Sequence, residues 1–336
     1  MASYWLDSKS GDDVTGDGSE LNPWKTLRKA VAAVTAPLTE DTYVYLKDPG
    51  DGTLYTGDFD MQGVRAIGGE YKLIIQPAPT LWDQDKYEAG EEDPFGGSGG
   101  FNPSTATFPI KVQLTLEIRD CTNIELRGLW FYATSSAASS LKLMMRTDVN
   151  ACYCRFEGAL AGVVAMMNSF FDSENCYYKG CNVGVLALYD SLVHLAGDTY
   201  LVNPITSGVH VGARSHLVVR ATPDYPDHNT LYVTTTLPRI KDFAALKAAA
   251  SSTICIQDES VLPLNMSTAF NAFVKIHHAN VVQAAEYYCV ALEDRSTLTG
   301  AARLRCTTIN LKSETVAMAR AHWVAGKSGQ GNLVVL

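Results

Sequence analysis

Three segments in the middle of the chain share one pattern: DCTNIELRG at residues 120–128, DVNACYCRFEG at 148–158 and DSENCYYKG at 172–180. Each has an Asp shortly before an Asn, then β-prone residues, a basic residue and a glycine. The Asn residues of the three segments lie 27 and 25 residues apart. Short strands that recur about every 25 residues are typical of a solenoid, in which each repeat packs against its neighbours.

Among solenoids, this pattern favours a parallel β-helix. The chain lacks the LxxLxLxxN phrase of leucine-rich repeats and the paired helices of other repeat classes. We therefore predict an all-β fold in which each coil supplies about three short strands. We also predict that Asn123, Asn150 and Asn175 stack at one turn of successive coils as an internal ladder, because Asn tolerates the left-handed backbone of such turns.

Composition excludes several classes of protein. Hydrophobic residues make up 46% of the 336 residues and charged residues 19%, which is incompatible with a disordered chain. The net charge of -9 argues against a protein that coats nucleic acid. No run of apolar residues predicts a transmembrane helix, and the polar start MASYWLDSKSGDD is not expected to be a signal peptide. The eight cysteines form no CxxC pair, so we interpret them as small buried hydrophobic residues.

A single amphipathic helix is predicted near the N-terminus, over residues 23–34. Asn22 is a suitable N-cap and Pro23 suits the first helical position. The apolar residues of one face are Trp24, Leu27, Val31 and Val34. We expect this helix to cover the open end of the solenoid, whose strand edge would otherwise aggregate.

The N-terminal segment resembles the entry segment of pectate-lyase-like β-helix proteins. The resemblance is carried by Asp7, by Gly11–Asp13 and Gly16–Gly18, and by NPWKTL at residues 22–27. It implies a right-handed, single-stranded parallel β-helix with an N-terminal capping α-helix. The superfamily includes polysaccharide lyases, glycoside hydrolases and epimerases, and also phage tailspikes and other virion proteins. The expected absence of a signal peptide favours the phage branch.

We divide the chain into three parts. Residues 1–42 hold the entry strand, loop and capping helix, and residues 43–240 form the β-helix with a loop excursion near 82–107. Residues 241–336 are a β-rich region of continued coils or an oligomerisation part, in which Asp242–Ala250 is predicted to be a short helix. The aspartates of the entry loop are interpreted as turn formers, since they lack the spacing of a calcium-binding loop.

Outward-facing side chains of successive coils are the candidate binding surface. If Ile124 and Leu126 point inward, Glu125 and Arg127 point outward. Arg155, Tyr177 and Lys179 are then predicted to continue that outer column on the following coils. Columns of bases, carboxylates and tyrosines suit a sugar chain, so the predicted glycan-binding residues are Glu125, Arg127, Arg155, Tyr177 and Lys179.

No complete catalytic motif is present. Of the phrases of polygalacturonase-like hydrolases, only Arg239–Lys241 (RIK) occurs. The carboxylates Asp148, Asp172 and Glu174 are weak candidates for catalytic groups because they fall on neighbouring coils. All seven histidines follow residue 193. We interpret them as buried, hydrogen-bonded residues, although His194 and His216 fall near corresponding coil positions and could stack. We predict neither a metal site nor a cofactor.

The leading hypothesis is a phage virion-associated β-helix protein, tail-associated or surface-displayed, for glycan adhesion or attachment to other virion proteins. The alternative is a polysaccharide-degrading lyase or glycoside hydrolase, and a second alternative is a purely structural capsid decoration protein. The resemblance implies a homo-oligomer, with a trimer favoured. Other expected partners are virion proteins and a surface polysaccharide, with no nucleic acid and no membrane insertion. The expected location is the virion, after folding in the host cytoplasm.

Overall fold

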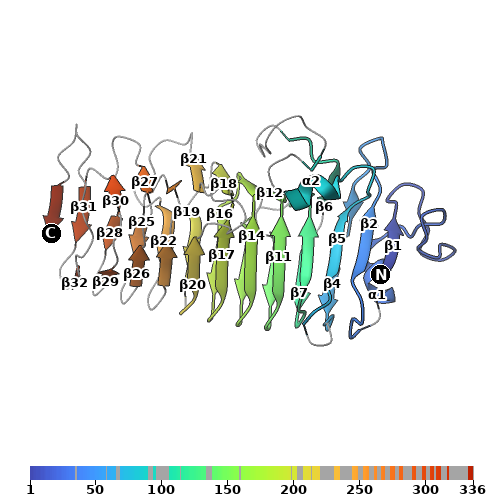
Figure 1. Cartoon of the computed structure of the whole chain (residues 1–336), viewed down its shortest axis with the longest axis horizontal. Coiled ribbons are helices and arrows are strands. Elements are labelled where there is room, and N and C mark those ends of the chain that lie inside the picture. The colour runs from blue at the N-terminus through green and yellow to red at the C-terminus, as the bar shows by residue number, and fades with distance from the viewer. Residues whose placement is uncertain are drawn as a thin grey trace.

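The structure is a computed structural model of the whole chain, and it describes residues 1–219 with short gaps. The gaps are at residues 35, 58, 66–68, 90–93, 96–105, 114, 134–137, 159, 198, 203–206 and 213. Beyond residue 219 it describes strand segments only, without their side chains. Figure 1 shows successive parallel strands side by side along one axis, which is the arrangement of a parallel β-helix.

Sheet 1 has 12 parallel strands and faces the viewer in Figure 1. In spatial order its strands are β1 (Ala2–Leu6), β2 (Thr42–Leu46), β5 (Leu73–Pro77), β8 (Ile124–Arg127), β11 (Asp148–Cys152), β14 (Phe170–Glu174), β17 (Leu192–Ala196), β20 (His216–Val219), β23 (Thr253–Ile256), β26 (Phe273–Ile276), β29 (Thr297–Thr299) and β32 (Val316–Ala317).

Sheet 2 has 11 strands, which precede those of sheet 1 in each coil. They are β4 (Phe59–Gln62), β7 (Leu116–Arg119), β10 (Ser139–Met144), β13 (Ala161–Met166), β16 (Val183–Leu188), β19 (Ser207–Val211), β22 (Ala244–Ala248), β25 (Met266–Thr268), β28 (Val290–Leu292), β31 (Thr308–Leu311) and β33 (Asn332–Val335).

Sheet 3 has seven strands and follows sheet 1 in each coil. They are β3 (Tyr55–Thr56), β6 (Ile110–Gln113), β9 (Leu129–Tyr132), β12 (Arg155–Glu157), β15 (Tyr177–Lys179), β18 (Thr199–Val202) and β21 (Leu231–Thr234). A further sheet of three strands contains β24 (Val261–Leu262), β27 (Asn280–Val282) and β30 (Arg303–Arg305).

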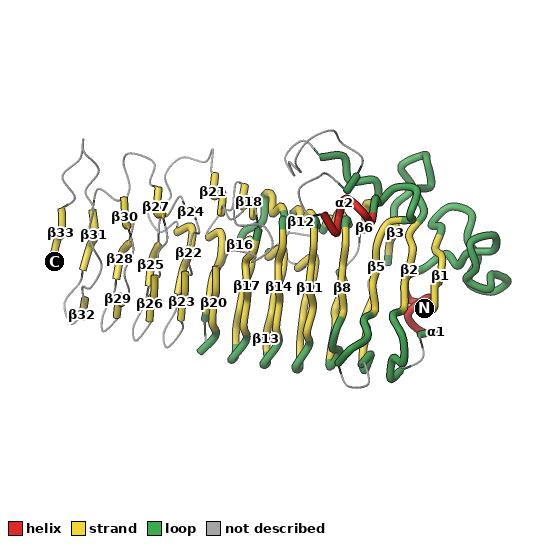
Figure 2. The backbone as a smooth tube through the Cα atoms, viewed as in Figure 1, coloured by secondary structure: helices red, strands yellow, loops and turns green. Residues whose placement is uncertain are grey.

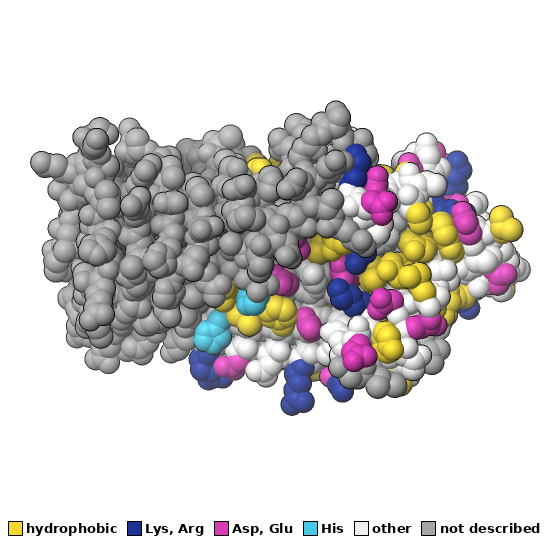
Figure 3. Space-filling view, in the orientation of Figure 1, with side chains coloured by type: hydrophobic (Ala, Val, Ile, Leu, Met, Phe, Trp, Pro, Cys, Tyr) yellow, Lys and Arg dark blue, Asp and Glu magenta, His cyan; other side chains and the backbone are white. Residues whose placement is uncertain are grey.

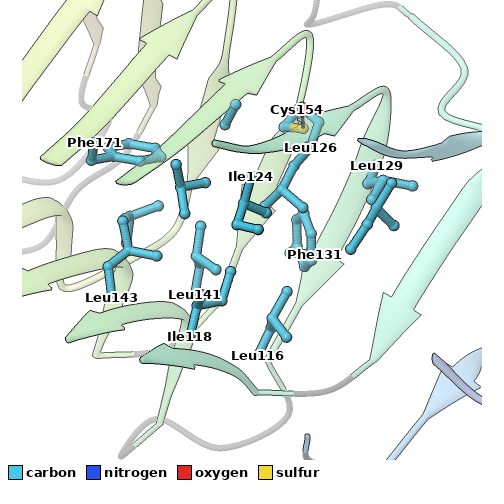
Figure 4. Close-up of a cluster of buried hydrophobic side chains, with 14 of the residues drawn as sticks. Leu116, Ile118, Ile124, Leu126, Leu129, Phe131, Leu141, Leu143, Cys154 and Phe171 are labelled. Atoms are coloured by element: carbon cyan, nitrogen blue, oxygen red, sulfur yellow. Dashed lines mark hydrogen bonds between the residues drawn. The ribbon is translucent and has the colours of Figure 1, made fainter. Parts of the chain in front are cut away.

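The core lies inside the coil, where alternate residues of most of the described strands up to β20 are buried. Ile124 and Leu126 point inward, as predicted, and belong to one continuous hydrophobic cluster with residues from all three sheets. Figure 4 shows Leu116 and Ile118 of β7 and Phe131 of β9 among this cluster. Alternation along the strands therefore places the intervening residues on the outside of the coil.

The α-helix near the N-terminus, α1 (Leu27–Ala33), is shorter than predicted. Its N-cap is Thr26, whose hydroxyl accepts a hydrogen bond from the Lys29 amide, and not Asn22. The reason is that Trp24 pairs with Leu6 in an extended bridge, so the helix cannot start before this residue. Helix α1 lies at the N-terminal end of the solenoid and contributes Leu27, Ala30 and Val31 to the core (Figure 2). Its role as a cap stays a prediction.

The internal ladder is made of hydroxyl groups and not of Asn side chains. The amide of Thr147 donates to Ser169 Oγ, that of Ser169 to Ser191 Oγ at 3.2 Å, and that of Ser191 to Ser215 Oγ at 3.1 Å. All four residues are buried at the corner between sheets 2 and 1. The hydroxyls of Ser169, Ser191 and Ser215 thus each satisfy a buried backbone amide of the preceding coil.

The predicted Asn ladder is wrong, because the three residues occupy different places in their coils. Asn123 precedes β8, Asn150 lies within β11 and Asn175 follows β14. Asn123 and Asn175 have positive φ angles of 58° and 51°, as expected for turns, but at opposite ends of the sheet 1 strands. Asn150 pairs in register with Glu125 and Asp172 on the outer face of sheet 1.

Two further predictions concern local structure. Residues 242–250 contain β22 and not the predicted helix, because Leu246 pairs in register with Val209 of β19 and extends sheet 2. The entry-loop aspartates do form turns: the carboxylates of Asp7, Asp12 and Asp17 each accept hydrogen bonds from backbone amides two or three residues later. This confirms their interpretation as turn formers.

The described cysteines are reduced and buried, as predicted. They are Cys121, Cys152, Cys154, Cys176 and Cys181. Cys255, Cys289 and Cys306 lie outside the residues whose side chains are described, as does Arg239–Lys241. The second helix, α2 (Gln84–Ala89), lies in the predicted loop excursion. In the part of the chain that the structure describes, neither helix is long enough to cross a membrane.

Candidate functional site

The outer face of sheet 1 carries the largest group of polar side chains that the sequence singled out. Because the strands pair in register, its outward residues form columns along the solenoid axis. The first column contains Glu125, Asn150, Asp172 and His194. The second contains Arg127, Cys152, Glu174 and Ala196. The third contains Asp148, Phe170, Leu192 and His216. Figure 3 shows acidic and histidine side chains on this face.

The predicted carboxylates Asp148, Asp172 and Glu174 are brought together on this face. Asp172 and Glu174 point outward from β14, and Asp148 points outward from the neighbouring strand β11. With strands about 4.8 Å apart and a rise of about 3.3 Å per residue, the Cα atoms of Asp148 and Asp172 lie about 8 Å apart. All three side chains are partly buried, so they are accessible but not fully solvated.

Asp148 has a carboxyl group with a raised pKa. Burial raises its pKa above the ordinary value of 3.8, and the nearby charge of Asp172 raises it further. His194 lies on the other side of Asp172, with Nδ1 4.0 Å from Asp172 Oδ2. The ring of His194 also meets the ring of Phe170 edge-on, with centroids 4.8 Å apart. Asp148 is therefore a carboxyl group whose pKa is raised by burial and by the charge of Asp172, and a histidine lies beside Asp172.

The pairing of His194 with His216 is not observed. His194 is in register with Asp172 and Val218, whereas His216 is in register with Leu192, two positions earlier along the strand. The sequence reasoning missed His194 as a site residue because it interpreted the histidines as buried, hydrogen-bonded residues. The signal that would have found it is the spacing of 22 residues between Phe171 and Val193, the inward residues just before Asp172 and His194.

Glu125 and Arg127 point out of the coil as predicted, but they are buried. Glu125 is 2% exposed and Arg127 is 6% exposed. Arg127 Nε donates to Glu125 Oε1 at 2.7 Å, and Lys72 Nζ lies 2.9 Å from Glu125 Oε2. The prediction that they form part of an open binding face is therefore wrong, because another part of the chain covers them.

The cover is formed by the described residues of the segment 78–95, which we call the wall. Tyr87 of α2 donates a hydrogen bond to Glu125 Oε1 at 2.9 Å, and its ring lies 4.6 Å from the Arg127 guanidinium. Gln84 Oε1 accepts from Arg127 Nη1 at 3.2 Å. Burial first, and then the Cys152 thiol and the Glu125 charge, raise the pKa of Tyr87, so its hydroxyl stays protonated and remains a donor.

Arg155, Tyr177 and Lys179 lie on another face of the coil. They belong to β12 and β15 of sheet 3, beyond the corner that Gly128, Tyr153 and Asn175 form with positive φ angles. The predicted single column is therefore wrong, since it crosses a corner. On sheet 3 the Arg155 guanidinium lies 4.1 Å from the Trp130 ring and 5.2 Å from the Tyr177 ring. Tyr177 is only 5% exposed, so this stack of rings and cations is largely covered.

Charge on the outer face of sheet 1 is predominantly negative. Glu125 is neutralised by Lys72 and Arg127 under the wall. Asp148, Asp172 and Glu174 add three further carboxyl groups to the described part of this face, and His194 Nδ1 lies 4.0 Å from Asp172 Oδ2. The described part of the chain also has no group of three or more His, Cys, Asp and Glu side chains arranged for a metal ion.

Comparison with known proteins finds similar solved structures. An alginate lyase from Paenibacillus sp. aligns with a TM-score of 0.40 and 10% identity, over 88% of this chain and 93% of that chain. A GH136 lacto-N-biosidase from Eubacterium ramulus aligns with a TM-score of 0.39 and 12% identity, over 100% of this chain and 67% of that chain. A rhamnogalacturonan lyase aligns with a TM-score of 0.22 and 12% identity, over 94% of this chain and 71% of that chain. No protein-family model and no curated protein matches the chain.

Proposed function

We propose that this protein hydrolyses a neutral glycan on the outer face of sheet 1, with Asp148 as general acid and Asp172 as general base. The observation that carries the proposal is the pair itself: two carboxyl groups on neighbouring strands, one of which has a raised pKa because of burial and the charge of the other. Paired carboxyl groups with different protonation states are the basic requirement of glycoside hydrolysis.

The geometry of the pair indicates how the reaction would proceed. Cα atoms about 8 Å apart are compatible with carboxyl groups about 6.5–9.5 Å apart, the spacing that leaves room for a water molecule between base and sugar. Asp148 would give its proton to the glycosidic oxygen, while Asp172 would take a proton from the water that attacks the anomeric carbon. Attack from the opposite face inverts the configuration at that carbon. His194, 4.0 Å from Asp172, would hold the base in place.

The charge of the face favours a neutral substrate over an acidic one. A lyase that acts on uronates must neutralise the substrate carboxylate, which calls for cations or metal ions near the reacting sugar. Here Arg127, the predicted cation, is buried against Glu125 under the wall. The charges of Asp172 and Glu174 would instead repel a uronate. The enzyme hypothesis, second in the sequence reasoning, thereby becomes the first, and hydrolysis becomes its favoured form.

The test is turnover on linear neutral glycans, with Asp148→Asn and Asp172→Asn as the catalytic variants. Asp190→Asn is the matched control, since Asp190 is exposed and pairs with Arg214 at a corner. We expect either catalytic variant to lose about 10²-fold or more of the release of reducing ends, while the control keeps wild-type activity. Release of reducing ends that is unaffected by both catalytic substitutions, or release of an unsaturated product, would contradict the proposal.

The phage-virion role is a second proposal, and what supports it is the resemblance of the entry segment. It requires that the protein retain a glycan or bind other virion proteins without turnover. Glycan retention by the wild type, with no release of reducing ends under any condition, would favour this role over hydrolysis. Trimerisation belongs to the same proposal and is tested by the mass of the protein in solution.

A further inference from the structure

We infer that the wall closes one end of the substrate path on sheet 1, so that the protein binds a glycan by its chain end and releases short fragments. This inference rests on the proposed function and specifies its mode of action. It follows from where the wall lies relative to the columns of the outer face, and from how firmly it is attached there.

Burial changes abruptly along the first column. The Glu125 side chain on β8 is 2% exposed, whereas the side chains of Asp172 on β14 and His194 on β17 are 18% and 17% exposed. In the second column Arg127 and Cys152 are buried, and Glu174 is partly exposed. The covered part of sheet 1 therefore ends within β11, where Cys152 is buried but Asp148 and Asn150 are partly exposed, so it borders the carboxylate pair.

The wall is attached to the coil by several independent contacts. Tyr87 donates to Glu125 at 2.9 Å, and Tyr87 Oη also lies 3.5 Å from Cys152 Sγ. The ring of Trp82 meets that of Tyr153 edge-on, with centroids 6.0 Å apart. Trp82 also packs directly on Gly128 at the corner, where a Cβ atom would lie 2.6 Å from the indole ring. These contacts hold the wall in a fixed position.

The distance from the wall to the carboxylates limits what fits between them. Glu125, which is covered, and Asp172 are two strands apart in the first column, or about 10 Å. A glycan that runs along this column could place only a short terminal fragment on the wall side of Asp172. On the other side the path continues past His194 toward β20, where His216 is exposed. The long part of the chain would leave in that direction.

Binding to a labelled chain end tests the inference independently of turnover. The Asp148→Asn variant is titrated with linear gluco-, xylo-, manno- and galacto-oligosaccharides that carry a bulky fluorescent tag at the reducing end or at the non-reducing end. For the sugar that binds, we expect one of the two tags to weaken binding by about tenfold or more, because it collides with the wall. The tag at the other end should be tolerated.

Opening the wall should remove this difference. In the background of Asp148→Asn, Trp82→Ala and Tyr87→Ala should bind both tagged forms equally, whereas Tyr189→Ala, which truncates an exposed aromatic residue at a corner, should keep the preference. Equal binding of both tagged forms by the protein with an intact wall would overturn the inference even if wild-type turnover is observed. End-selective binding without wild-type turnover would instead support binding by the chain end, and it would refute the proposed hydrolysis together with the release of fragments. Thermal unfolding of each variant checks that it is folded.

Discussion

The buried ion pair under the wall offers a sharp test of the structure. Replacing Glu125 by Gln leaves the Arg127 guanidinium without a carboxylate in a site where the arginine is 6% exposed. Removing one partner of a buried ion pair costs about 3–5 kcal/mol, because the remaining charge stays desolvated. Replacing Arg127 by Met should cost less, since Lys72 still lies 2.9 Å from Glu125 Oε2 and reaches solvent. The two substitutions together should recover part of the loss.

The measurement is thermal unfolding of the two single variants and the double variant. For 336 residues unfolding as one unit, an entropy of about 2.1 cal/mol/K per residue makes about 1 kcal/mol equivalent to about 1.4 °C. The Glu125→Gln variant should therefore melt about 4–7 °C below the wild type. A double-mutant cycle should give a coupling energy within about 0.5–3 kcal/mol. Single substitutions that each shift the melting temperature by less than about 1 °C would refute the burial of this pair.

The pH dependence provides a second readout of the same pair. Burial alone would raise the pKa of Glu125, but the charge of Arg127, followed by that of Lys72, holds it below its ordinary value of 4.5. A carboxyl group with a depressed folded-state pKa adds stability above its unfolded pKa and loses it as the pH falls through the folded pKa. The wild type should thus lose stability below about pH 4.5, and the Glu125→Gln variant should lose less of it.

Three other outcomes are expected from unfolding experiments. Asp148→Asn should stabilise the protein at pH 7, because ionising a carboxyl group with a raised folded-state pKa costs stability above that pKa. This gain should vanish below the ordinary pKa of 3.8, and urea midpoints measured at pH 7 and below that pKa would show the difference. Ser191→Ala should cost about 1–3 kcal/mol, because the buried Ser169 amide loses its acceptor, whereas Ser3→Ala on the exposed surface should cost less than about 0.5 kcal/mol. Phe156→Ala should cost about 3–5 kcal/mol, because its ring is stacked between two others at 5.3 and 5.1 Å.

The period and the alternation of the sequence were sufficient to predict the architecture. Both signals can be recognised in the order of residues along the chain: inward residues such as Ile124 and Leu126 recur at every second position, and the coils between Ile124 and Val193 are 22 to 25 residues long. The carboxylates Asp148 and Asp172 could be placed on neighbouring coils for the same reason. The pKa of Asp148 and the separation of the two residues could not be predicted, because both depend on the register between strands.

The register was mispredicted because identical residues were aligned instead of inward residues. Ile124, Val149 and Phe171 are paired in the structure. Relative to these partners, Asn123 lies one position before, Asn150 one position after and Asn175 four positions after. When one coil is a few residues shorter than the coil before it, polar residues at equal sequence spacing fall at different positions relative to the turns. The inward hydrophobic residues cannot shift, because their burial determines how the coil closes.

The burial of Glu125 and Arg127 was beyond sequence reasoning for a different reason. The wall that covers them lies about 40 residues earlier in the chain, in a segment without any strand pattern. Nothing local to Glu125 distinguishes it from Asp172, which occupies the same column two strands later and is partly exposed. Such a contact is long-range, and it determines which part of a regular surface is available to a ligand.

The regularity of the corners also explains how a solenoid could hold a catalytic pair without specialised loops. The corner residues Arg146, with φ 63°, and Asn168, with φ 61°, each donate a backbone hydrogen bond to the corner of the next coil. Together with the hydroxyl ladder, they set the register of β11 and β14 and hence the separation of Asp148 and Asp172. Inserting one residue within β11 after Asp148 would turn this side chain toward the core, because successive residues of a strand face opposite sides. The spacing of the pair is therefore a property of the backbone of the coil.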